Sequence, residues 1–273
     1  MSPTQFGILA VPVYLAATAM LVRSLRNDYI AAPTSRFQNQ AIIGLGWLGA
    51  VLHGLSLSDM CDGAGHVDFN FFVTSSLAGL SIVVVLLLTT LTRPLEKLGI
   101  IIFPLACLLV LTEVSFHEPG RALKAYTWQI SSHILISMLS YSFLNIAALQ
   151  ALLVSFQDWH LHNRHPSGFI RSLPPLQTME KLLFQLIGAG FLLLSISLLT
   201  GALFVEDLFA QHLVHKTVLS ILAWIVFGIL LAGRFWQGWR GQTAIRWTLG
   251  GFFVLMLAYF GSKIVLELIL KRT

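Results

Sequence analysis

Two histidines stand inside long apolar segments, where imidazole is the side chain best suited to bind a metal. His53 lies in the segment GWLGAVLHGLSLS, and His133 opens the segment HILISMLSYSFLN. Ionisable residues in such segments are costly and usually face the protein interior. A neutral imidazole offers one lone pair, and heme iron is held axially by histidine in many proteins. Axial ligation of a heme iron is therefore one interpretation; the other is that each histidine only hydrogen-bonds a neighbouring helix.

The composition predicts a membrane setting for both histidines. The chain has 273 residues, of which 56% are hydrophobic and 11% are charged, whereas a soluble domain carries about 25% charged residues. Windows of about 20 apolar residues recur, which is the length of helix that crosses a hydrocarbon core. We predict an all-α fold, a polytopic membrane helical bundle of about eight transmembrane helices, with residues 1–273 as a single domain.

The apolar windows give approximate bounds for the eight spans. They are residues 6–25, 40–57, 71–91, 99–116, 130–156, 182–204, 217–232 and 247–270. Loops after the first, third, fifth and seventh spans hold most of the 17 Lys and Arg residues, and such loops stay in the cytoplasm. Both termini are therefore predicted on the outer side of the membrane. The basic residues are scattered rather than gathered on one face, so nucleic acid is not an expected partner.

These spans place the two histidines at a similar depth. His53 lies about 20 Å above the start of its outward-running span, near Gln40, at a rise of about 1.5 Å per residue. His133 lies three or four residues into a span that runs inward from the outer side. Two helices of opposite direction thus present imidazoles in the outer third of the hydrocarbon layer. We expect one heme b, held between His53 and His133.

Other polar residues fit a heme less specifically. Arg121 and Lys124 lie just outside the His133 span and could pair with the heme propionates, although ordinary solvated loop charges are the alternative. His212 and His215 form a His-x-x-His pair in a later outer loop, without a third ligand of matching spacing. The chain has no GxSxG or HExxH motif and no phosphate-binding glycine loop. We therefore expect a protein that is not an enzyme.

The span that begins near His133 carries a recognisable pattern. It places Ser137, Ser140 and Tyr141 after the histidine, with Phe143 near the expected aromatic position. Further motifs are TGALF (200–204), Lys216 before a long apolar span, GWRG (238–241) and YFGSKIV (259–265). Together they resemble the cytochrome c assembly transmembrane family, whose signature is H-x-x-x-S-x-x-S-Y-x-x-F and which includes heme-handling proteins of the Ccs and Ccm systems.

The resemblance is strongest over residues 130–270 and is closest to the short bacterial inner-membrane members, the YpjD and HemX type. It implies heme binding or heme handling related to cytochrome c biogenesis, with His53 and His133 as candidate ligands. It also implies a multi-pass location in the bacterial cytoplasmic (inner) membrane. The expected partners are membrane lipid, heme and another membrane subunit of cytochrome c maturation.

One loop departs from the family pattern. Heme-presenting members carry a tryptophan-rich segment in an outer loop, whereas the loop here, VEDLFAQHLVHK, contains no tryptophan. The departure leaves a second hypothesis open. In it, the protein is a membrane subunit that keeps the fold without heme and acts in transport or in the regulation of ion or metabolite homeostasis.

Overall fold

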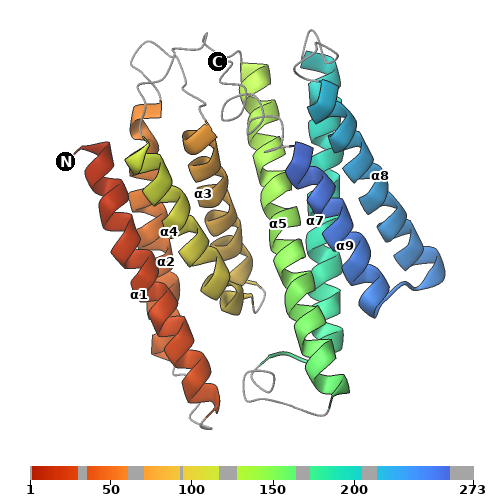
Figure 1. Cartoon of the computed structure of the whole chain (residues 1–273), viewed down its shortest axis with the longest axis horizontal. Helices are drawn as coiled ribbons and strands as arrows, with labels where there is room; N and C mark the ends of the chain where they lie inside the picture. Colours follow the sequence, from red (N-terminus) through yellow and green to blue (C-terminus); the bar gives the residue numbers. More distant parts are fainter. Residues whose placement is uncertain are drawn as a thin grey trace. The chain divides into compact units, whose positions relative to one another are not determined.

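The computed structural model describes residues 2–29, 36–60, 71–92, 95–116, 128–163, 173–204 and 214–258. These residues form eight α-helices and two short 3-10 helices and contain no strand (Figure 1). The helices are α1 (Pro3–Tyr29), α2 (Arg36–Ser56), α3 (Phe71–Thr90), α4 (Gly99–Ser115), α5 (Trp128–His162), α7 (Leu176–Phe204), α8 (Val214–Gln237) and α9 (Gly241–Met256). The predicted all-α bundle is therefore confirmed.

Within the described ranges, six helices are long and apolar enough to cross a membrane, namely α1, α3, α4, α5, α7 and α8. Helix α9 has 16 described residues, fewer than the roughly 20 that a crossing needs. Helix α2 opens with the polar sequence RFQNQ. The prediction of a helical membrane bundle is confirmed, and the number of eight membrane crossings stays a prediction.

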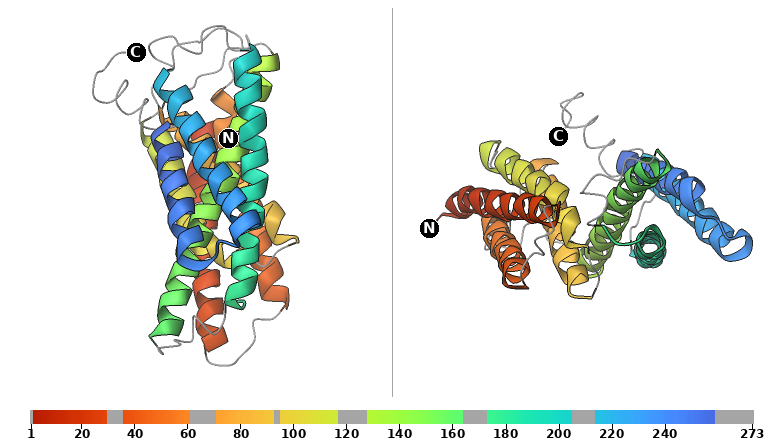
Figure 2. Two further views of the ribbon diagram at one scale, coloured as in Figure 1. Left: turned by 90° about the vertical axis from the view of Figure 1, so that its right-hand side faces the viewer. Right: turned by 90° about the horizontal axis from the view of Figure 1, so that it is seen from below.

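The helices divide into two compact units. The N-terminal unit contains α1 to α4, and Figure 2 shows α1 lying along α2 and α4. The C-terminal unit contains α5, α7, α8 and α9, in which α5 packs along α7 and also contacts α9. The assignment of residues 1–273 to a single domain stays a prediction.

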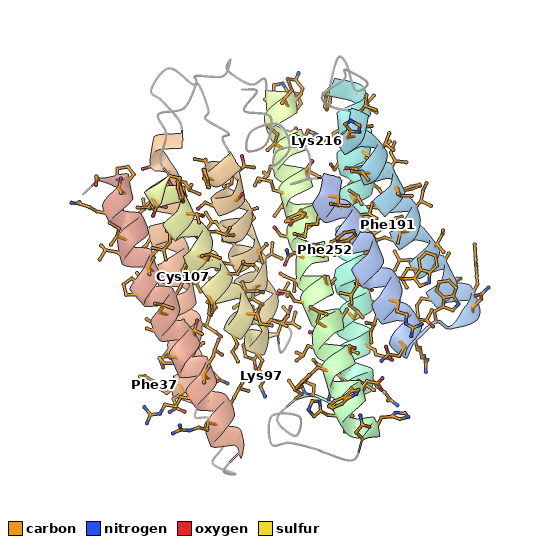
Figure 3. All side chains as sticks on the ribbon, viewed as in Figure 1. Phe37, Lys97, Cys107, Phe191, Lys216 and Phe252 are labelled. Carbon is orange, nitrogen blue, oxygen red and sulfur yellow. The ribbon has the colours of Figure 1, made fainter. Side chains whose placement is uncertain are left out.

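Small and aromatic side chains bring the helices of the N-terminal unit together. Ala10, Tyr14 and Ala17 of α1 are fully buried and recur at the helical spacing that gives one buried face. Tyr14 stacks on Phe103 of α4, with ring centroids 5.8 Å apart. Cys107, labelled in Figure 3, places its Sγ 3.7 Å from the Val11 carbonyl and so links α4 to α1 again.

The C-terminal unit is built on the close approach of α5 and α7. A Cβ added to Gly190 of α7 would lie 2.6 Å from Cγ of Leu144 on α5, so only glycine allows this packing. The Ser140 hydroxyl donates to the Gly190 carbonyl at 3.0 Å. On the other faces, Phe252 of α9 approaches Tyr141, and Phe191 of α7 stacks on the Trp224 ring of α8 (Figure 3).

Helix α7 begins six residues earlier than the apolar window predicted. The carbonyl of Pro175 accepts the amides of Thr178 and Met179, at 2.8 and 3.1 Å, so the Pro174-Pro175 pair starts the helix. Proline is favoured at this end of a helix because its missing N–H has no partner to lose there. Hydropathy marks only the apolar part of the helix, and its polar first turn extends beyond that part.

The predicted loop over residues 233–246 is also mostly helical. Helix α8 continues to Gln237 and α9 starts at Gly241, which leaves a short turn with positive φ angles at Gly238 (67°) and Gly241 (54°). The Trp239 ring lies so close to Gly233 that an added Cβ would be 2.5 Å from it. Local contacts of this kind, which hydropathy does not record, allow both helices to extend.

Polar contacts then tie the α8–α9 turn to α7. The Gly241 amide donates to Oε1 of Glu180 at 2.7 Å, and Arg234 lies 4.6 Å from the ring centroid of Phe184. Phe235 and Trp236 beside the turn are 86% and 79% exposed. Exposed aromatic rings at a helix end are typical of the membrane–water interface, so the turn marks one boundary of the C-terminal unit.

Candidate functional site

His53 lies at the meeting point of three helices of the N-terminal unit. It is fully buried on α2, its Nε2 lies 2.9 Å from the Ser76 hydroxyl of α3, and its Nδ1 lies 3.4 Å from the Tyr14 hydroxyl of α1. Both partners are hydroxyl groups that can donate or accept, so either tautomer of the imidazole is accommodated. His53 therefore holds α1, α2 and α3 together through one polar side chain.

The position of the Tyr14 ring is fixed by its neighbours. A Cβ added to Gly49 of α2 would lie 2.6 Å from this ring, so the glycine provides the space that the ring occupies. The ring meets the His53 imidazole edge to face, with centroids 6.1 Å apart at 83°. The tyrosine hydroxyl is thus directed at the histidine by packing on both sides.

His133 lies in a different setting in the C-terminal unit. It sits in the second turn of α5, is half-buried, and its Nδ1 lies 3.0 Å from the Thr200 hydroxyl of α7. The ring lies against Gly201, where an added Cβ would be 3.1 Å from Cε1. Two consecutive residues of α7 therefore hold this imidazole.

The two ring nitrogens of His133 differ in their surroundings. Nδ1 has the Thr200 hydroxyl as its partner, and the Ser197 backbone also contacts the ring, whereas no described side chain hydrogen-bonds to Nε2. An imidazole with one nitrogen fixed by a hydrogen bond and the other available matches the usual arrangement of a histidine that ligates a metal. The residues around His133 therefore fit an axial heme ligand.

Ligation of a metal by His53 requires an additional step. Because both of its nitrogens bond to hydroxyls, one bond must open before a lone pair reaches a metal. The bond to Tyr14 is the longer of the two and lies near the limit for a hydrogen bond, so it is the weaker one. His53 thus fits a ligand only after a local rearrangement at Tyr14.

Of the other candidate residues predicted from the sequence, only some lie in the described part of the chain. Arg121, Lys124 and His212 lie outside the described residues, and their roles stay predictions. His215 is exposed in the first turn of α8, beside Lys216 (Figure 3). No group of three His, Cys, Asp or Glu side chains that could hold a metal ion occurs in the described parts of the chain.

Sequence reasoning missed the partners of both histidines. Tyr14, Ser76 and Thr200 carry hydroxyls that any polar stripe on an apolar helix also has, so their type alone does not single them out. Thr200 and Gly201 open the TGALF segment, but the motif gives no rotation of α7 relative to α5. One signal could have pointed to such a partner, namely a small residue beside a threonine at the level of a buried histidine.

Comparison with known proteins agrees with the motifs. Residues 42–270 match the model of the family described as cytochrome c assembly protein. The inner membrane protein YpjD of Escherichia coli strain K12 is 32% identical over 267 residues, which cover 97% of this chain and 98% of that protein. The cytochrome c biogenesis protein CcsA of Chlamydomonas reinhardtii is 27% identical over 139 residues, or 50% of this chain and 38% of that protein. No solved structure matches the chain. The chain therefore belongs to the cytochrome c assembly protein family.

Proposed function

We propose that this protein is a non-enzymatic heme-binding protein of the bacterial inner membrane that takes part in cytochrome c biogenesis. The family membership and the names of the relatives support the biogenesis role and the location. A heme b, when bound, would supply an iron that imidazole nitrogens can ligate. We propose His133 as the first ligand and His53 as the second.

The observation that carries the proposal is the state of the His133 ring. Its Nδ1 is held at 3.0 Å by Thr200, and its Nε2 makes no hydrogen bond to any described side chain. A half-buried imidazole in an apolar helix is costly unless it has a partner or a function. Ligation of iron through Nε2 would give a partner to the nitrogen that no described side chain bonds.

His53 would ligate the iron through Nδ1, whereas His133 would use Nε2. The weaker bond, from Nδ1 to Tyr14 at 3.4 Å, is the one we expect to open on ligation. The bond from Nε2 to Ser76 at 2.9 Å would remain and would orient the ring. Ser76 would then support His53 as Thr200 supports His133, which is the usual role of a group behind a metal ligand.

Charge and partners complete the proposal. Arg121 and Lys124 remain the candidates for pairing with the propionates, because guanidinium and ammonium groups bind carboxylates by charge-assisted hydrogen bonds. Membrane lipid surrounds the apolar helices, and another membrane subunit of cytochrome c maturation is the protein partner that the family membership supports.

An absorption spectrum of the detergent-purified protein tests the heme assignment. The wild type, oxidised and then reduced, should give a b-type spectrum. His133→Ala and His53→Ala should each lose most of the bound heme. The control is His162→Ala, because His162 is exposed at the far end of α5 and should leave the spectrum unchanged. A His133→Ala variant that keeps the full wild-type spectrum would remove His133 as a ligand.

A second function is favoured by one structural observation and one sequence observation. His53 already has both nitrogens in hydrogen bonds, and the sequence VEDLFAQHLVHK lacks the tryptophans of heme-presenting members. Both suit a subunit that keeps the fold without heme and acts in transport or homeostasis. This alternative predicts a colourless protein that does not take up added heme and a deletion strain with normal levels of holo-cytochrome c.

A further inference from the structure

We infer that Thr200 is a positioning residue for His133 that fixes the imidazole proton on Nδ1 and leaves the lone pair on Nε2. The proton position is a property of the protein without heme. Its use in iron binding rests on the proposed function. The inference starts from the hydrogen-bonding capacity of the Thr200 hydroxyl, which holds one hydrogen and can direct it to one group or share it between two.

The hydrogen of Thr200 is directed into its own helix. The Thr200 oxygen lies 2.9 Å from the Ile196 carbonyl and 3.0 Å from the Ser197 carbonyl, and a carbonyl oxygen can only accept. The hydroxyl that donates to these carbonyls must then accept in its third contact, which is Nδ1 of His133 at 3.0 Å. Nδ1 therefore carries the hydrogen, and Nε2 is the bare nitrogen.

A second pair of hydroxyls keeps the helices in this register. The Ser137 hydroxyl donates to the His133 carbonyl and also lies 2.7 Å from the Ser197 hydroxyl. Because the Ser137 hydrogen is used within α5, the Ser197 hydroxyl is the donor between the helices. Two bonds one helical turn apart, at Thr200 and Ser197, thus fix α7 against α5 and keep the His133 ring at the Thr200 oxygen.

Gly201 packs against the His133 ring and fixes its orientation. The imidazole lies over Gly201, with Cε1, Nδ1 and Nε2 at 3.1, 3.7 and 3.8 Å from where a Cβ would stand. The ring therefore packs against the glycine through its Cε1 side. Thr200 fixes the proton on Nδ1, and Gly201 fixes the orientation of the ring. Together they fix the direction of the Nε2 lone pair.

A hydrogen bond to the remote nitrogen of a ligating histidine usually strengthens its binding to a metal. A donor bond from the remote nitrogen fixes the tautomer and raises the basicity of the ligating nitrogen, and its loss typically costs about 10- to 100-fold in metal affinity. Thr200→Val keeps the shape of the side chain and removes the acceptor. Thr200→Ser restores the hydroxyl and should restore the behaviour of the wild type.

The first test reads the proton directly in the protein without heme. Solid-state 15N NMR of protein labelled at the histidine rings separates a protonated nitrogen from a bare one, and the His133 signals are those that disappear in His133→Gln. We expect Nδ1–H in the wild type and in Thr200→Ser, and a mixture of tautomers in Thr200→Val. Thr248→Val is the matched control, because among the described residues the Thr248 hydroxyl bonds only to the Ala244 carbonyl of its own helix.

The second test is a heme titration of the same variants. Thr200→Val should bind heme about 10- to 100-fold more weakly than the wild type, with recovery in Thr200→Ser and no change in Thr248→Val. An Nε2–H tautomer in the wild type overturns the inference whatever the heme result. A wild type that binds no heme but shows the Nδ1–H tautomer, lost in Thr200→Val, upholds the positioning role and removes the proposed function instead.

Discussion

The Thr200 hydroxyl oxygen lies 3.0 Å from Nδ1 of His133, although 67 positions separate the two residues in the chain. The bond crosses from α7 to α5, so the orientation of the imidazole depends on how these two helices pack. The adjacent Gly201 lies under the same ring. A substitution that changes the spacing of α5 and α7 will therefore act on the histidine even where it touches neither residue.

Gly201→Ala should weaken heme binding without unfolding the protein. The new Cβ would lie 3.1 Å from Cε1 of His133, which is tighter than ordinary contact, so the ring must move. We expect about a tenfold loss of heme affinity, comparable to the loss of a supporting contact behind a metal ligand. The measurement is a heme titration followed by absorbance.

The control for this variant lies on the same helix. Gly188 of α7 has no heavy atom within 4 Å of an added Cβ, so Gly188→Ala should bind heme like the wild type. Equal affinity in Gly201→Ala and Gly188→Ala would show that the ring position does not limit heme binding.

Gly49→Ala should destabilise the N-terminal unit. An added Cβ would stand 2.6 Å from the Tyr14 ring, which is fully buried and cannot move outward without losing its contact with His53. Overpacking of this kind costs about 1–3 kcal/mol. Gly44 of the same helix has open space, so Gly44→Ala should unfold at or above the wild-type temperature, because alanine favours the helix more than glycine does. Thermal unfolding in detergent compares the two, and equal midpoints would contradict the packing argument.

Removal of the Glu180 carboxylate should loosen the start of α9. Its Oε1 accepts the Gly241 amide at 2.7 Å, and one such bond contributes about 1 kcal/mol. Glu180→Ala should therefore lower the unfolding midpoint, while Glu180→Gln keeps an oxygen acceptor and should lose less. Hydrogen exchange at the Gly241 amide gives a local measure. An exchange rate that is the same in the wild type and both variants would show that this hydrogen bond does not stabilise the start of α9.

Both termini should lie on the outer side of the inner membrane. Most of the Lys and Arg residues fall in the loops after the first, third, fifth and seventh predicted spans, and the positive-inside rule places these loops in the cytoplasm. A C-terminal fusion to alkaline phosphatase should be active, and a fusion to green fluorescent protein at the same point should not fluoresce. The opposite pair of results would reverse the predicted orientation.

The order of the helices could be predicted from sequence because apolar windows of sufficient length mark each one. Their ends could not. Helix α7 begins at Leu176 and α9 at Gly241, each six residues before its apolar window. In both cases a polar first turn is stabilised by contacts that hydropathy does not measure, at Pro175 and at Glu180.

The candidate site was predictable only in part. A histidine in an apolar helix stands out by its cost, so His53 and His133 could be found from the sequence. Their partners depend on the rotation of each helix about its axis, which is set by packing such as that of Tyr14 against Gly49. The similar depth of the two histidines stays a prediction, because each belongs to a different unit.

The short turn between α8 and α9 has a consequence for how the chain is made. Three residues separate the two helices, and closing so short a loop costs little chain entropy once both helices exist. The Trp239 ring and the Gly233 backbone that seal the turn are also close in sequence. The two helices should therefore pair as a hairpin before α9 docks onto α5.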